Sequence, residues 1–239
     1  MDGVRLAALY SYKPNKLGFC GPRSAENTNL LYEFLGGDES KKDRVRQYLA
    51  KFEGAFPYYK LIASHNSIED PFNEKVVEAY WLGNVLLEKV TSGAIKRMIK
   101  KEFVGEGLLS LSQAERLIEK LPFGIKAHHS THVFHVGSVT GRVVLKGKLL
   151  DMCRVCWGKV EKVQKNRIEV FYKPTVLTKE RKELGFYRKD FVHREPKFVP
   201  KIKKGDTISF HWQEACQVLS EKQEKNLEKY TKHALSLLK

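Results

Sequence analysis

The sequence predicts an α+β fold, with a helical N-terminal domain over residues 1–127 and a β-rich domain over residues 128–239 that ends in a helix. Apolar residues in the first part recur at helical spacing, whereas from His128 onward they alternate with polar residues, as in strands. The charge divides at the same place. Before His128 there are 19 Lys and Arg against 16 Asp and Glu, and from His128 onward 24 against 12. A compositional step of this size supports two domains.

The helices of the first part are predicted from their caps and apolar faces. Ser24 is a good N-cap for a helix that Gly36 would end, and Asp70 followed by proline is a typical helix start. Ser112 and Glu115 match a capping box. We therefore expect helices over residues 24–35, 40–54, 56–63, 70–83, 91–103 and 112–122.

The second part is rich in β-branched and aromatic residues, with glycine, asparagine and aspartate at the breaks. The segment 129–145 is expected to be a hairpin that bends at Gly137 and Gly141. The segment 220–238 repeats apolar residues at helical spacing and is expected to be the C-terminal helix. Further strands are expected over residues 153–163, 167–177 and 207–213.

The chain is strongly basic, with 43 Lys and Arg against 28 Asp and Glu and a formal net charge of +15. This charge favours acidic partners, nucleic acid first and an acidic protein surface second. Between Val176 and Lys204 there are ten basic and four acidic residues. We expect a basic docking surface there, formed by Lys179, Arg181, Lys182, Arg188, Lys189 and Arg194.

Several classes of protein are excluded by composition. No stretch approaches the ~20 apolar residues of a membrane span, and the first residues lack the apolar run and cleavage site of a secretory signal. The four cysteines do not make a disulfide framework in a chain of this length. We therefore expect a cytoplasmic protein without a membrane span.

Four of the eight histidines lie within the octapeptide HHSTHVFH, residues 128–135. On a strand His129 and His135 would share one face, whereas on a helix His128, His132 and His135 would. Neutral imidazoles on one face can bind a transition metal. His129, His132 and His135 are therefore candidate metal ligands, and hydrogen bonds to backbone carbonyls are the structural alternative.

The sequence Met152–Val160 contains a Cys-x-x-Cys pair, Cys153 and Cys156. A structural zinc site would need two more ligands at a recognised spacing, and a thioredoxin-like pair would need a helix N-terminus. The predicted strand supplies neither. Cys20, between Gly18 and Gly21, is a further candidate thiol, as is Cys156; filler cysteines are the structural alternative.

Three segments together resemble the HypC/HupF family of [NiFe]-hydrogenase maturation chaperones. That family begins Met-Cys, three residues, Pro-Gly-Lys-Val, and Met152–Val160 reads Met-Cys, three residues, Trp-Gly-Lys-Val. Lys204–Trp212 is similar to the family's Gly-Asp-x-Val-x-x-His strand, and Cys216–Glu221 to its turn into a C-terminal helix. The order is kept over about residues 150–239.

This resemblance implies a small OB-like β-barrel with a C-terminal helix. It also implies that Cys153 and His211 serve the iron of an Fe(CN)2CO unit, which is passed to the hydrogenase large subunit or to another maturation protein. The layout of the whole chain, with LGFCGP, FEGAFPYY, VVEAYWLGN and HHSTHVF, resembles an uncharacterised bacterial and archaeal domain family. That second resemblance implies no activity.

Two functions follow as hypotheses. The first is an accessory or maturation factor for a metalloenzyme, [NiFe]-hydrogenase above all, which carries an iron centre or another transition metal, or docks, without turnover. The alternative is a protein that binds RNA or single-stranded nucleic acid through its basic β-barrel half, where aromatic and basic residues interleave. A hydrolase or redox enzyme is less favoured, because no catalytic triad, phosphate loop or carboxylate pair is present in the sequence.

Overall fold

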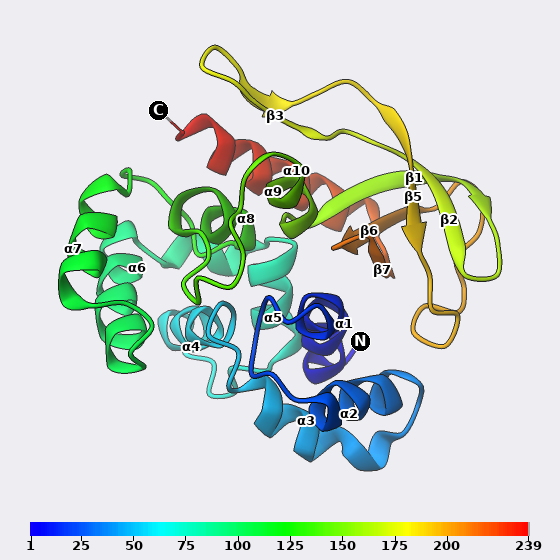
Figure 1. Ribbon diagram of the computed structural model, residues 1–239, viewed down its shortest axis with the longest axis horizontal. Coiled ribbons are helices and arrows are strands. Elements are labelled where there is room, and N and C mark those ends of the chain that lie inside the picture. Colours follow the sequence, from blue (N-terminus) through cyan, green and yellow to red (C-terminus); the bar gives the residue numbers. More distant parts are fainter. Residues whose placement is uncertain (239) are drawn as a thin grey trace.

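The computed structural model describes residues 1–238 and confirms the α+β class (Figure 1). Helices fill the first half of the chain, and the strands follow residue 155. The α-helices are α1 (Gly3–Lys16), α2 (Ala25–Leu35), α3 (Lys42–Leu49), α4 (Phe56–His65), α5 (Glu74–Trp81), α6 (Ser92–Met98), α7 (Leu111–Lys120), α8 (His129–Thr131), α9 (Gly147–Cys153) and α10 (Glu221–Ser236). The shorter turns are the 3-10 helices η1 (Glu39–Lys41) and η2 (Val85–Lys89) and the π-helices η3 (Ile99–Phe103) and η4 (His132–Val136). No helix within residues 1–238 is both long and apolar enough to cross a membrane.

Helix α1 joins the two halves and was not among the predicted helices. It is buried on nearly every side, so it lacks the polar stripe that marks a surface helix. It packs against α2, α3 and α5 and also against β6 and β7. The hydroxyls of Tyr10 and Ser209 are 2.7 Å apart in the buried contact. The hydrophobic core is consequently continuous from the helices into the strands.

The strands are β1 (Cys156–Val163), β2 (Arg167–Tyr172), β3 (Thr175–Leu177), β4 (Lys182–Leu184), β5 (Arg188–His193), β6 (Thr207–His211) and β7 (Glu214–Val218). Within the described chain, β1, β2, β5, β7 and β6 pair in that order and return to β1 as a closed barrel. The link between β5 and β7 is a single parallel pair, His193 with Glu214, and the other pairings are antiparallel. That this arrangement is OB-like, as the resemblance implies, stays a prediction. Strands β3 and β4 form a separate arm that projects beyond the barrel (Figure 1).

The predicted hairpin at 129–145 is wrong. Residues 129–136 form helix α8 and the π-turn η4, and Gly137, with a φ of 79°, ends the turn by donating its N–H to His132 O. The segment has high β-propensity, but it is buried against α5 and α10, and such packing overrides propensity. Cys153 is likewise not on a strand, because it is the last residue of α9, and only Cys156 lies on β1.

Two predicted helix starts are also shifted. Helix α5 begins at Glu74 rather than at Asp70, because the Asp70 carboxylate caps Phe72 N–H and pairs with Arg46. The capping box of α7 is Ser110 with Gln113. The predicted cap of α2 at Ser24 is confirmed.

The C-terminal helix α10 packs on the helical half through a close contact with Gly83. The Tyr230 hydroxyl donates to Asn84 O at 3.0 Å, and its ring lies over Gly83. A Cβ at Gly83 would lie 2.1 Å from Tyr230 Cδ2, and the φ of +86° disfavours any other residue. The glycine therefore permits the docking of α10.

Gly83→Ala should lower the free energy of unfolding by about 2–3 kcal/mol, because it adds backbone strain to a steric clash. Gly107→Ala is the control, since Gly107 has a φ of +68° but no neighbour within 4 Å among the described residues. It should cost only about 1–2 kcal/mol. Urea titration of both variants measures the difference; equal losses would contradict the close contact.

Candidate metal centre

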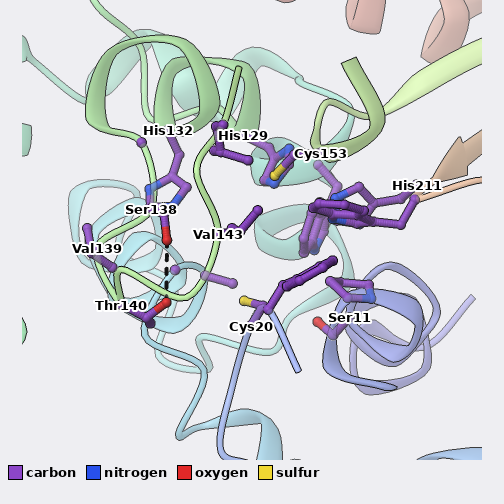
Figure 2. A pocket seen from close by; sticks show the side chains of 18 of the residues that line it. Ser11, Cys20, His129, His132, Ser138, Val139, Thr140, Val143, Cys153 and His211 are labelled. Atoms are coloured by element: carbon purple, nitrogen blue, oxygen red, sulfur yellow. Dashed lines mark hydrogen bonds between the residues drawn. The ribbon is translucent and has the colours of Figure 1, made fainter. Parts of the chain in front are cut away.

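Three residues from separate elements converge in the interior. His129 lies on α8, Cys153 ends α9 and His211 ends β6. Their ligand atoms all lie within 4.8 Å of one another (Figure 2). Cys153 and His211 are the two residues that the HypC/HupF resemblance implies, and His129 belongs to the octapeptide. The arrangement is a two-imidazole, one-thiol donor set.

The two imidazoles have buried nitrogens that no other described residue satisfies. The carbonyl of Tyr10 can only accept, so His211 Nδ1 carries the proton and donates it at 2.7 Å. His211 Nε2 therefore holds the lone pair, and it is buried with no hydrogen-bond partner within residues 1–238. His129 Nδ1 is likewise buried with no hydrogen-bond partner among these residues. A backbone carbonyl that fixes the tautomer of a histidine is typical of metal ligands.

Packing fixes the orientation of these side chains. The His129 ring lies 4.5 Å from the Trp81 ring and 5.0 Å from the His211 ring, centroid to centroid. The backbone N–H of Trp212 donates to Met152 O at 2.9 Å and so ties the end of α9 to the end of β6. These contacts hold the three donor side chains close together.

Burial sets the protonation states of the cluster. It lowers the pKa of His129 well below its usual value and that of His211 to about 4, so both rings are neutral at pH 7. Burial raises the pKa of the Cys153 thiol, which is therefore protonated in the metal-free protein. A metal ion binds neutral imidazole and thiolate, so binding at this site would release a proton.

The cluster faces a small cavity of about 50 Å³ (Figure 2). Since one water needs about 10–15 Å³ of such space, the cavity has room for an ion and a few water-sized ligands. Cys20 and His132 line the same cavity away from the cluster. A Cβ at Gly54 would lie 3.2 Å from His132 Nε2 and 3.7 Å from Cys20 Sγ, so the glycine keeps both groups open to the cavity.

The other candidate residues are not part of the cluster. His132 Nδ1 is 3.3 Å from the Tyr58 hydroxyl, and His135 Nε2 donates to Ala234 O at 2.8 Å, outside the cavity. Cys156 is buried, and its thiol donates to Asp151 O. Cys20 lies in the cavity, and burial raises its pKa to about 12. Of the proposed ligands and thiols, only His129, Cys153 and His211 lie within mutual ligating distance.

The residues of the predicted basic docking surface are spread over separate places. Lys179, Arg181 and Lys182 lie at the tip of the β3–β4 arm. Arg188 donates to the Tyr172 hydroxyl, and Lys189 pairs with Glu169 at 2.9 Å. The guanidinium of Arg194 donates to Pro200 O. The basic docking surface itself stays a prediction.

Sequence reasoning missed a buried ion pair whose two residues, Asp151 and Arg154, lie on either side of Cys153 in the chain. Arg154 is fully buried and donates to the Asp151 carboxylate at 3.1 Å, which also accepts from the Tyr172 hydroxyl and the Thr175 N–H. Desolvation opposes ionisation of Asp151, but Arg154 and Thr175 hold its pKa below the usual value. An Asp and an Arg on either side of a Met-Cys pair were the only sequence signal.

The buried histidines predict that the protein loses stability in acid. Burial lowers the pKa of His132 and of His211 to about 4, whereas an unfolded histidine titrates near 6.5. Between these values the unfolded chain binds more protons, so the free energy of unfolding should fall as the pH drops from 6.5 to 4. The slope is up to about 1.4 kcal/mol per pH unit for each histidine. Urea titrations at pH 7, 6 and 5 measure it, and His132→Gln should reduce the slope; a flat profile would contradict the neutral histidines.

The fold and the cluster define an α+β protein with a buried two-histidine, one-cysteine donor set between its helical and β parts. The chain belongs to the Family of unknown function (DUF6390), whose model matches residues 1–239. No curated protein and no solved structure matches the chain.

Proposed function

We propose that this protein is an accessory factor in the assembly of a metalloenzyme, and that it carries a transition-metal centre held by His129, Cys153 and His211. The observation that carries the proposal is the convergence of these donors on a cavity, with unsatisfied buried nitrogens on both histidines. A buried polar atom without a partner is costly, and a bound metal ion would satisfy each nitrogen that it ligates.

The donor set favours iron, zinc or copper over magnesium or calcium, because thiolate and imidazole are the softer protein ligands. Three protein donors also leave coordination positions open, as in the facial triads of non-haem iron proteins. An Fe(CN)2CO unit brings three small ligands of its own and needs three more donors to become six-coordinate. The number of donors suits such a unit, and the small cavity lies directly beside them.

The resemblance to the HypC/HupF family makes [NiFe]-hydrogenase the specific client that we propose. The motif residues Cys153 and His211 are two of the three donors, and their side chains meet although they are far apart in the chain. A carrier must release its centre, and a cluster that borders a cavity is more accessible to a partner than one sealed in the core. The hydrogenase large subunit or another maturation protein would be that partner.

Infrared spectroscopy of anaerobically purified protein tests this function. The protein would be co-produced with a [NiFe]-hydrogenase and its maturation proteins. The proposal predicts stoichiometric iron and the stretching bands of bound cyanide and carbon monoxide. Iron without these bands would agree with a metal carrier but would exclude the Fe(CN)2CO unit as its cargo. Protein without any metal would contradict the proposal.

A further inference from the structure

A second feature lies on the outside of the barrel and takes no part in the metal cluster. The antiparallel registers align Lys159 of β1, Phe171 of β2 and Lys189 of β5 in one row across three strands. Val160 and Val170, next to Lys159 and Phe171, are buried in the barrel, and so is Val192, three residues after Lys189. Since side chains alternate along a strand, the row belongs to the outer face.

The outer face repeats the combination of aromatic and basic side chains. Phe191 is 40% exposed, and the guanidinium of Arg167 lies 3.5 Å from its ring centroid. Next to the face, Tyr187 is 66% exposed, with the ammonium group of Lys173 at 4.7 Å from its ring. Lys189 is 5.5 Å from the ring of Phe171. Flat surfaces for stacking thus alternate with positive charges.

The face is predominantly positive. Its acidic residues are few: Glu169 on β2 pairs with Lys189 at 2.9 Å, and Glu161 lies on β1 between Lys159 and Lys162. Asp190 of β5 alternates with the outward residues of its strand and pairs with Arg188. Lys159, Arg167 and Lys173 form no ion pair with any residue in the described part of the chain. These cations are available to an anionic partner.

We propose that the outer face of β1, β2 and β5 binds single-stranded nucleic acid, with bases stacked on Phe171, Phe191 and the Arg167 guanidinium. Phosphates would lie beside Lys159 and Lys173. In chain order β2 and β5 are the second and third strands of the barrel ring, and the equivalent face of OB-folds binds oligonucleotides. Stacking platforms interleaved with cations fit a chain of bases and phosphates better than an acidic peptide, which would use the charges alone.

Fluorescence anisotropy with a labelled oligouridylate of about 16 nucleotides tests the proposal. The full chain should bind the single strand, and a duplex of equal length more weakly. Phe171→Ala and Phe191→Ala should each weaken binding about 5- to 100-fold. Phe123→Ala is the matched control, because Phe123 is 93% exposed in the helical half and should have no effect.

The salt dependence gives a second readout that survives any loss of stability in the phenylalanine variants. Lys159→Ala should lower the slope of log affinity against log salt by about 0.7, whereas Lys101→Ala in the helical half should leave it unchanged. Absence of binding at low salt, or phenylalanine variants that bind like the wild type, would overturn the proposal. Polyglutamate that binds equally well and depends on the same phenylalanines would assign the face to an acidic protein instead. Cys153→Ala should bind the oligonucleotide normally, so this test is separate from that of the metal centre.

Discussion

Cys153→Ala should abolish tight metal binding. The residue supplies the thiolate of the donor set, and the two histidines alone would leave a weak site. Loss of a supporting partner costs 10- to 100-fold in metal affinity, so loss of the ligand itself should cost on the order of 100-fold or more. Titration of the metal-free protein with Co²⁺ measures this directly, because thiolate bound to Co²⁺ gives an intense near-ultraviolet charge-transfer band.

Cys156→Ala is the matched control for this measurement. Cys156 is three residues away in the same segment and is also buried, but its thiol donates to Asp151 O outside the cluster. This variant should keep the charge-transfer band and an affinity close to that of the wild type. If Cys156→Ala lost the band and Cys153→Ala kept it, the assignment of the thiol ligand would be wrong.

Asp151→Ala should be among the most destabilising single substitutions in the chain. It would leave the Arg154 guanidinium, which has no exposed surface, without its carboxylate. It would also remove the acceptor of the Tyr172 hydroxyl and the Thr175 N–H. Breaking one side of a buried ion pair costs about 3–5 kcal/mol, and urea titration measures it.

Asp190→Ala is the control for this loss. Asp190 pairs with Arg188 at 3.6 Å in a partly exposed site, where a salt bridge contributes about 0–1 kcal/mol. A loss of less than about 1 kcal/mol in Asp151→Ala would show that the Arg154 guanidinium finds another partner or reaches water. Since α9 carries both Asp151 and Cys153, we expect Asp151→Ala to weaken Co²⁺ binding as well.

The parts of the fold that local signals specify were predictable. Ser24 caps α2 as expected, and the spacing of Leu227 and Tyr230 predicted α10. Helix α1 was missed because it is buried on nearly all sides and has no amphipathic pattern. The segment 129–145 is predicted to be a hairpin because its residues favour strands, whereas the conformation of residues 129–136 depends on contacts with α5 and α10 that are distant in sequence.

The candidate metal centre was predictable only in part. The motif order indicated Cys153 and His211, and the histidine cluster supplied His129 among other candidates. Which histidine joins the two could not be predicted, because the strand and helix alternatives each gave a different set, and neither described a helix followed by a π-turn. The carbonyl of Tyr10, which orients His211, lies on a helix that local sequence does not reveal.

X-ray absorption spectroscopy of the protein loaded with one equivalent of zinc tests the central claim most directly. His129, Cys153 and His211 predict one sulfur ligand at about 2.3 Å and two imidazole nitrogens at about 2.0–2.1 Å, with the remaining ligands light atoms. The sulfur contribution should disappear in Cys153→Ala and persist in Cys156→Ala. A spectrum with no sulfur ligand, or with two, would contradict the two-histidine, one-cysteine centre.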